Sequence, residues 1–258
     1  MPELDAACSF TITTANTHFS RAIATSESAH LLAGSDILLA QEVLELPKDT
    51  LLRNIGSIGL SITIQNEEAG LTIAASDRFT KIKGEYFCIQ PAGRLADTAN
   101  RIGLKQRLRE RGLLIAKLRD ELTGDYLTVA TAHPIVCLRA VSRAQQVRRI
   151  NAILTQRHAV GPLVLGADLN HYPEANKVDK QLAAGSRLKP VSNTDPTCLL
   201  INTRHSWLRY LGVHDARLDS LMFRGLTEIS SEVTKIASDH LALKGVFDFI
   251  DRTSKYTP

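Results

Sequence analysis

The feature that most limits the fold of this chain is the stretch Gly161–Asn170, in which an apolar run ends in polar residues. A short apolar run with Gly161-Pro162 before it and Gly166 after it is typical of a buried β-strand. Asp168 and Asn170 lie two positions apart, and in an extended chain such residues point to the same side. A carboxylate and an amide held side by side on a rigid strand end are suited to a functional site. A turn is the alternative, because Asp and Asn also favour turns.

The same pattern recurs along the chain, so that polar side chains follow several predicted strands. Strands are predicted at residues 9–17, with Asn16 near the end, and at 35–42, which ends at Glu42. A strand at 126–132 is followed by His133. Late strands are expected at 218–224, which contains Asp219, and at 242–249, which follows Asp239 and His240. Further strands are predicted at 60–65, 70–76, 81–89 and 112–118. Eight polar strand exits in one chain favour a site more than any one of them does alone.

Helices are predicted between these strands. One spans residues 19–32 and ends at the C-cap Gly34, and another lies near 176–183. A third begins at Ser142, where Gln145 three residues on suggests a capping box. Its apolar stripe shares a face with Arg143, which would direct that guanidinium toward the strand ends.

Composition limits the class of protein. With 258 residues, 44% hydrophobic and 22% charged, the chain is typical of a globular protein, and one domain over 1–258 is the simplest interpretation. Its four cysteines are far apart, which favours reduced thiols over a disulfide framework or a zinc site. There is no apolar run of ~20 residues and no basic segment before an apolar run near the start, so we expect a soluble, cytoplasmic protein.

The net charge of +4 is unevenly distributed. Asp and Glu are absent from 126–167, where five arginines occur, and a second basic run spans 101–111. Basic clusters suit a polyanion such as nucleic acid or an anionic lipid surface. For either run alone, a solvated helix face is the favoured explanation.

The residue types at the strand exits favour a metal-dependent phosphoryl chemistry. Carboxylates such as Glu42 and Asp239, with the amide of Asn16, are hard oxygen ligands suited to Mg²⁺. The lack of clustered Cys and the small number of candidate His argue against a zinc cage. Imidazoles and an arginine can stabilise the charge that develops on a phosphate during in-line displacement.

The ordered set of motifs resembles the endonuclease/exonuclease/phosphatase superfamily. The set comprises Asn16, Gln41-Glu42, Ala132-His133, Gly166-Ala-Asp168-Leu-Asn170, Leu218-Asp219 and Ser238-Asp239-His240. The resemblance implies an α/β four-layer sandwich, with two mixed β-sheets packed face to face and flanking helices. It also implies a phosphoric ester hydrolase that uses Mg²⁺, with Mn²⁺ as a substitute.

Roles carried over from the resemblance are expectations for each residue. Metal ligands would be Glu42, Asn16 and Asp239. Asp168 would orient and deprotonate the attacking water, and Asn170 would hold that water or a phosphate oxygen. His240, oriented by Asp219, and His133 would contact the scissile phosphate or assist the leaving group, and Arg143 would bind phosphate.

The sequence departs from the family pattern at two motifs. The usual Gly-Asp-Phe-Asn is Gly-Ala-Asp-Leu-Asn at 166–170, with the key Asp and Asn kept. Ser220 follows Asp219 where an aromatic residue is common, which bears on local packing. His at position 133 is similar to the deoxyribonuclease and sphingomyelinase branches, whereas abasic-site endonucleases usually have Tyr. Because the Arg-rich runs at 101–111 and 139–149 favour a polyanion, nucleic acid is the expected substrate class, and stable membrane insertion is not expected. A phosphatase or phospholipase C-like hydrolase of a sugar-phosphate or lipid head group is the alternative, and a non-catalytic binding module is the alternative of another class.

Overall fold

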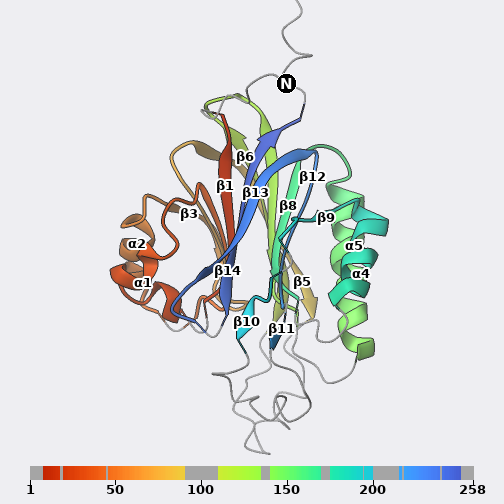
Figure 1. Cartoon of the computed structure of the whole chain (residues 1–258), viewed down its shortest axis with the longest axis horizontal. Coiled ribbons are helices and arrows are strands. Elements are labelled where there is room, and N and C mark those ends of the chain that lie inside the picture. The colour runs from red at the N-terminus through yellow and green to blue at the C-terminus, as the bar shows by residue number, and fades with distance from the viewer. Residues whose placement is uncertain are drawn as a thin grey trace, which may run out of the picture.

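The computed structural model describes residues 8–17, 20–44, 46–90, 110–134, 140–169, 175–193, 195–199, 215–216, 218–238 and 240–250, with backbone alone at 140–143, 175–179, 198–199 and 215–216. Two six-stranded sheets form the centre of this part of the chain (Figure 1). The first contains, in spatial order, β13 (Leu226–Lys235), β14 (Leu241–Phe249), β1 (Phe10–Asn16), β2 (Ile37–Gln41), β4 (Leu71–Ala75) and β3 (Ser61–Asn66). The second contains β5 (Phe79–Gln90), β6 (Arg111–Asp120), β7 (Tyr126–Ala132), β8 (Leu163–Asp168), β12 (Asp219–Arg224) and β9 (Lys189–Pro190).

Both sheets are mixed. β1 pairs in parallel with β2 in the first sheet, and β7 pairs in parallel with β8 in the second, while the other pairs are antiparallel. A small separate sheet pairs β10 (Cys198–Leu199) with β11 (Asp215–Ala216). The ends of β1, β2, β7 and β8 and the starts of β12 and β14 consequently lie at one edge of the sandwich.

Helices cover the outer face of each sheet, which makes four layers (Figure 1). The first sheet is covered by the 3₁₀ helix η1 (Arg21–Ile23), α1 (Ser26–His30) and α2 (Lys48–Gly56), and the second by α4 (Ala140–Arg157) and α5 (Ala175–Ser186). Successive side chains of each strand point to opposite faces of its sheet, so one strand contributes both to the core between the sheets and to the core under the helices. On β2, Ile37 and Leu39 join the core between the sheets, whereas Leu38 packs with the helices. The four-layer α/β sandwich predicted from the sequence is confirmed.

A glycine lets the two sheets approach each other closely. A Cβ atom on Gly166 in β8 would lie 2.7 Å from Cβ of Thr14 in β1 and 2.8 Å from a methyl group of Leu39 in β2. Beside it, the buried amide of Gln41 donates hydrogen bonds to the hydroxyls of Thr14 in its own sheet (3.1 Å) and Thr131 in the other (2.8 Å). The two sheets are thus joined by a polar contact directly beneath the edge where the strands end.

Some elements differ from the sequence prediction. The helix expected over 19–32 is instead η1 followed by α1, because the Thr25 side chain accepts a hydrogen bond from the Ser28 backbone and starts a new helix. α4 begins at Ala140 rather than at Ser142. Five elements were not predicted: α2, β13 and the two-residue strands β9, β10 and β11. Most of β13 is exposed or half-buried because it is an edge strand, so it lacks the apolar run by which the other strands were predicted.

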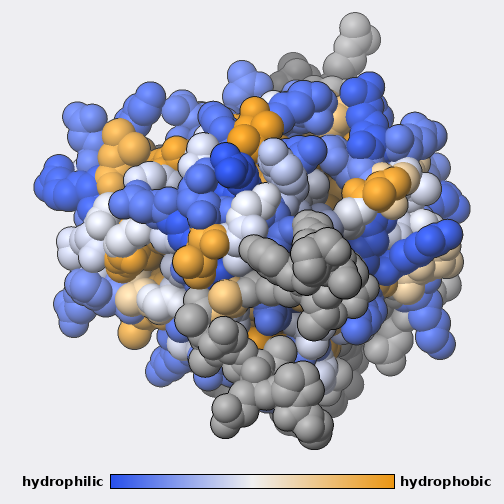
Figure 2. Space-filling model, turned by 90° about the horizontal axis from the view of Figure 1, so that it is seen from above, coloured by the Kyte–Doolittle hydropathy of each residue, from blue (hydrophilic) through white to orange (hydrophobic). Residues whose placement is uncertain are grey.

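The described surface is mostly hydrophilic on the face seen from above, where hydrophobic residues form separate spots (Figure 2). Among the described residues, no helix is both long enough and apolar enough to span a membrane.

Candidate active site

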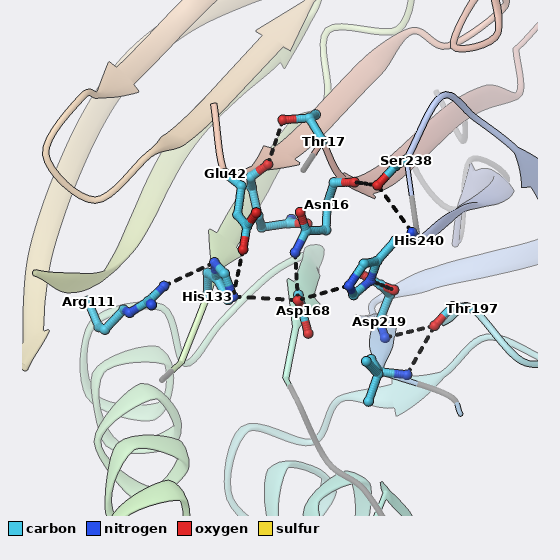
Figure 3. Close-up of polar contacts among 12 residues, drawn as sticks. Asn16, Thr17, Glu42, Arg111, His133, Asp168, Thr197, Asp219, Ser238 and His240 are labelled. Carbon is cyan, nitrogen blue, oxygen red and sulfur yellow. Dashed lines mark hydrogen bonds and ion pairs between the residues drawn. The ribbon is translucent and has the colours of Figure 1, made fainter. Parts of the chain in front are cut away.

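Six of the predicted site residues lie together at one edge of the sandwich (Figure 3). Asn16 ends β1, and Glu42 follows β2, its parallel neighbour in the first sheet. His133 follows β7, and Asp168 ends β8, its parallel neighbour in the second sheet. The antiparallel strands supply the other two at their starts: Asp219 opens β12 directly opposite Asp168, and His240 precedes β14.

Asp168 is the centre of this group. Its Oδ2 accepts a hydrogen bond of 2.7 Å from Nδ2 of Asn16 in the other sheet. The same oxygen lies 3.5 Å from Nε2 of His133 and 3.9 Å from Nε2 of His240. With an exposed fraction of 1%, the Asp168 side chain is buried, so these polar neighbours replace water around it.

Asp219 and His240 form a carboxylate–imidazole pair. Nδ1 of His240 lies 2.8 Å from Oδ2 of Asp219, and both groups are buried. An ionised carboxylate only accepts hydrogen bonds, so Nδ1 carries the ring proton and donates it, and Nε2 faces Asp168. This arrangement fixes the tautomer and orientation of the ring.

Arg111 determines the tautomer of the second imidazole. Its Nη1 lies 3.1 Å from Nδ1 of His133, and because a guanidinium only donates, Nδ1 must accept. The proton of the neutral ring is then on Nε2, which faces Asp168 and lies 3.8 Å from Oε1 of Glu42. Burial lowers the pKa of His133 well below 6.5, and the positive charge of Arg111 lowers it further. The neutral form is therefore the resting state of His133.

Glu42 has an unusual backbone conformation. Its φ of 55° lies in the left-handed region, which costs a non-glycine residue about 1 kcal/mol or more. The carbonyl of Glu42 accepts a hydrogen bond from the backbone N–H of Ser20, and the next residue, Val43, donates to the carbonyl of Gly70. These bonds hold the carboxylate at the edge of the site, where it is 20% exposed, the most accessible of the three carboxylates.

The site concentrates negative charge around Asp168. The pKa of Asp168 is raised to about 7: burial is the largest cause, and the carboxylates of Asp219 and Glu42 add to it, against the opposing effects of His240 and the Asn16 hydrogen bond. A carboxyl group with such a pKa can exchange a proton near neutral pH, as a general base must.

Two supporting residues come from outside the predicted set. The hydroxyl of Thr197 accepts hydrogen bonds from the backbone N–H groups of Leu218 and Asp219, which fixes the start of β12. Ser238, part of the Ser-Asp-His motif, donates to the carbonyl of Asn16 and accepts from the N–H of His240. Thr197 lies in a loop between predicted elements, and no sequence signal marks it. Arg111 was predicted only as one member of a basic run.

Three predicted site residues are not placed. Asn170 and Asp239 lie outside the described residues, as does the side chain of Arg143, whose backbone belongs to α4. Their expected roles remain predictions.

The donor set fits a divalent cation. Oxygen ligands are available from Glu42 and from the amide of Asn16, whose nitrogen already faces Asp168. One ligand atom each from Asp168, Asp219 and His240 also lie within 4.8 Å of one another and could hold an ion. Because Asp219 and His240 already bond to each other, we regard the accessible Glu42 side of the cluster as the better cation position.

Comparison with solved structures gives the class of fold. An endonuclease/exonuclease/phosphatase from Bacteroides vulgatus matches with a TM-score of 0.69 and 15% identity, over 93% of this chain and 99% of that one. TDP2 of D. rerio, complexed with a single-strand DNA product, matches at 0.65 and 15% over 93% and 99%. A mannosyl-6-phosphatase of Bacteroides thetaiotaomicron matches at 0.65 and 12% over 93% and 100%.

The chain therefore has the fold of the endonuclease/exonuclease/phosphatase superfamily, as its motifs predicted. No protein-family model matches the sequence, and a comparison with curated proteins finds no match.

Proposed function

We propose that this protein is a metal-dependent phosphoric ester hydrolase of one domain, which cleaves a P–O bond of nucleic acid by attack of water. The observation that carries the proposal is the environment of Asp168. One buried carboxylate with a pKa of about 7 has an amide and two imidazoles around it, drawn from both sheets. Such a group suits the activation of water beside a phosphate.

The residues divide the chemistry between them. Asp168 accepts the proton of the attacking water, while Asn16 holds its carboxylate in place. The Nε2 atoms of His133 and His240 lie on either side of Asp168, where they can contact phosphate oxygens as charge develops. Asp219 stabilises the protonated form of His240. Asn170 and Arg143 are proposed as further phosphate contacts.

Glu42, Asn16 and Asp239 would hold Mg²⁺ or Mn²⁺. When bound, the cation would supply positive charge to the phosphate oxygens and to the leaving group. The crowding of three carboxylates supports this assignment, because Asp219 and Glu42 both raise the pKa of Asp168 and a cation would relieve that repulsion.

The substrate class rests on charge and on one structural neighbour. The basic runs at 101–111 and 139–149 favour a polyanion, and the solved TDP2 structure contains a single-strand DNA product. Hydrolysis of a phosphate monoester is the second candidate, favoured by the similarity to a mannosyl-6-phosphatase. A lipid head group has less support, because only 5% of the residues are aromatic and the sequence shows no amphipathic, aromatic-rich hairpin for membrane docking.

A Mg²⁺-dependent hydrolysis panel tests the proposal. It compares single-stranded and plasmid DNA, RNA, bis-p-nitrophenyl phosphate, p-nitrophenyl phosphate and sphingomyelin, with Asp168→Ala as the blank. We expect diester hydrolysis that Asp168→Ala abolishes while the fold is kept. Monoester turnover alone would favour the second candidate. Absence of turnover on every substrate, with metal present, would leave the non-catalytic binding module.

A further inference from the structure

A groove outside the catalytic edge has no part in the chemistry described above. It lies between the end of α4 and strands β5, β6 and β7 of the second sheet, of which β5 is an edge strand, and consists of two adjoining cavities of ≈ 500 and ≈ 410 Å³. Gln156 and Arg157 near the end of α4 line both. We propose that this groove binds a single strand of nucleic acid at nucleotides beyond the cleaved phosphate. The inference rests on the proposed function for its substrate class.

Cations from three elements converge in the groove. Lys83 comes from β5, Lys117 from β6, and Arg149 and Arg157 from α4. Among the residues that line the two cavities Glu85 is the one acid, and it already contacts Lys83 (3.1 Å) and Arg157 (3.8 Å). The residues that line the groove therefore include four cations and one acid, an excess of positive charge that is complementary to a phosphate backbone.

Two aromatic rings lie against cations of the groove. The Arg157 guanidinium lies 5.3 Å from the centre of the Phe87 ring, and the Lys117 ammonium lies 4.9 Å from that of Tyr126. Arg157 is 61% exposed and Tyr126 50% exposed, so both side chains are accessible to a ligand. Bases of a single strand stack on aromatic rings and on guanidinium planes, while its phosphates contact cations. Free phosphate would use only the cations.

The position of the groove relative to the site fits a continuous strand. β5 ends at Gln90, opposite Arg111 in β6, and Arg111 contacts His133 of the catalytic group. Arg149 donates to the carbonyl of Ile89 at this end, whereas Lys83 lies toward the other. From residue 83 to residue 88 the strand covers roughly 17 Å, the rise of about five nucleotides in a helical strand.

The arrangement of these cations argues against the simpler explanation of a solvated helix face. In a helix face that is only solvated, the arginines are not expected to lie beside lysines from two strands and beside half-buried rings. Lys83 and Lys117 belong to neither basic run of the sequence, and only the pairing of β5 with β6 brings them together.

Paired substitutions of equal charge test the proposal. The groove variant is Lys117→Gln with Arg157→Gln, and the control is Lys48→Gln with Arg53→Gln on the exposed side of α2, which covers the other sheet. Binding of a fluorescent single strand of about 20 nucleotides is measured by anisotropy in EDTA over a range of salt. Hydrolysis of bis-p-nitrophenyl phosphate with Mg²⁺ is measured in parallel.

We expect the groove variant to bind the oligonucleotide about tenfold more weakly and with a salt slope smaller by about 1.4, while the control binds as the wild type does. Small-diester hydrolysis should be equal in all three proteins. Equal oligonucleotide binding by the groove variant and the control would overturn the groove proposal and leave the proposed function standing. Groove-dependent binding by a wild type that hydrolyses no phosphoester would support the groove and refute the proposed hydrolase.

Discussion

Nδ2 of Asn16 donates to Oδ2 of Asp168 across 2.7 Å, although the two residues are 152 positions apart. Asn16 ends a strand of one sheet and Asp168 ends a strand of the other. The hydrogen bond therefore spans the interface between the sheets, and the candidate catalytic group exists only when both sheets are folded and aligned.

Asp168→Asn should make the metal-free protein more stable at alkaline pH. The pKa of Asp168 is about 7 in the folded protein, whereas the ordinary value for an aspartate, which applies to the unfolded chain, is 3.8. Between these values the folded chain holds a proton that the unfolded chain has lost, so stability falls as pH rises through this range. At pH 8 in EDTA we expect the variant to exceed the wild type by about 4 kcal/mol in free energy of unfolding, with the difference disappearing toward pH 4. A difference that stays constant with pH, measured by urea unfolding, would refute this.

Glu42→Gln should weaken the binding of the metal on which activity depends. The substitution keeps the size of the side chain and removes the charge at the most accessible carboxylate of the group. We expect the Mg²⁺ concentration for half-maximal activity to rise about tenfold or more. The check is a Mg²⁺ titration of bis-p-nitrophenyl phosphate hydrolysis, and a curve that matches the wild type would exclude Glu42 as a ligand.

Asp219→Asn should reduce kcat by about 10²- to 10⁴-fold, because an amide can no longer hold His240 in one tautomer or stabilise its charge. Thermal unfolding of the variant should show that the fold is kept. Thr197→Val is a useful companion, since it removes the hydroxyl that accepts from the N–H of Asp219 but leaves the carboxylate. A kcat within twofold of the wild type in Asp219→Asn would remove the pair from the mechanism.

Arg111→Gln should raise the pKa of His133. Burial is the main cause of the low pKa of this ring and would persist, but the positive charge of Arg111 would be lost. The expected result is an upward movement of the His133 titration, followed by NMR in the metal-free protein, with a lower kcat. Arg119→Gln, a change of the same charge at an exposed position of the same strand, is the control. An unmoved titration would mean that Arg111 does not set the state of His133.

Arg78→Leu should destabilise the protein by about 3 kcal/mol. Arg78 pairs with the buried Asp120 at 2.8 Å, and its loss leaves that carboxylate without its cation. Arg78 also donates to the backbone carbonyls of Cys8 and Ser9, at the start of β1. Arg119→Gln again serves for comparison, because its pair with Glu121 is exposed and should contribute less than about 1 kcal/mol. If chemical denaturation shows equal losses of stability in the two variants, the buried pair contributes no more than the exposed one, and the prediction is wrong.

These site residues could be predicted from the sequence because each is a polar residue at one end of an apolar run, at the end of β1, β2, β7 or β8 or at the start of β12 or β14. Asn16, Glu42, His133, Asp168, Asp219 and His240 were all found in this way, and the structure brings them together. Arg111 could not be assigned to the site, since its contact with His133 depends on the register of β6 with β7. Thr197 was missed for the same kind of reason: its partners are backbone groups of a distant strand.

The close packing at Gly166 has a mechanical consequence. Thr14 and Leu39 fill the space where a side chain would stand, so the two halves of the catalytic group have a fixed separation. Any slip of one sheet over the other by a single residue would pull Asn16 away from Asp168 while nearly all backbone pairing survived. Turnover should therefore report sheet alignment more sensitively than circular dichroism does. On warming, we expect activity to be lost at a lower temperature than the circular dichroism signal of the strands.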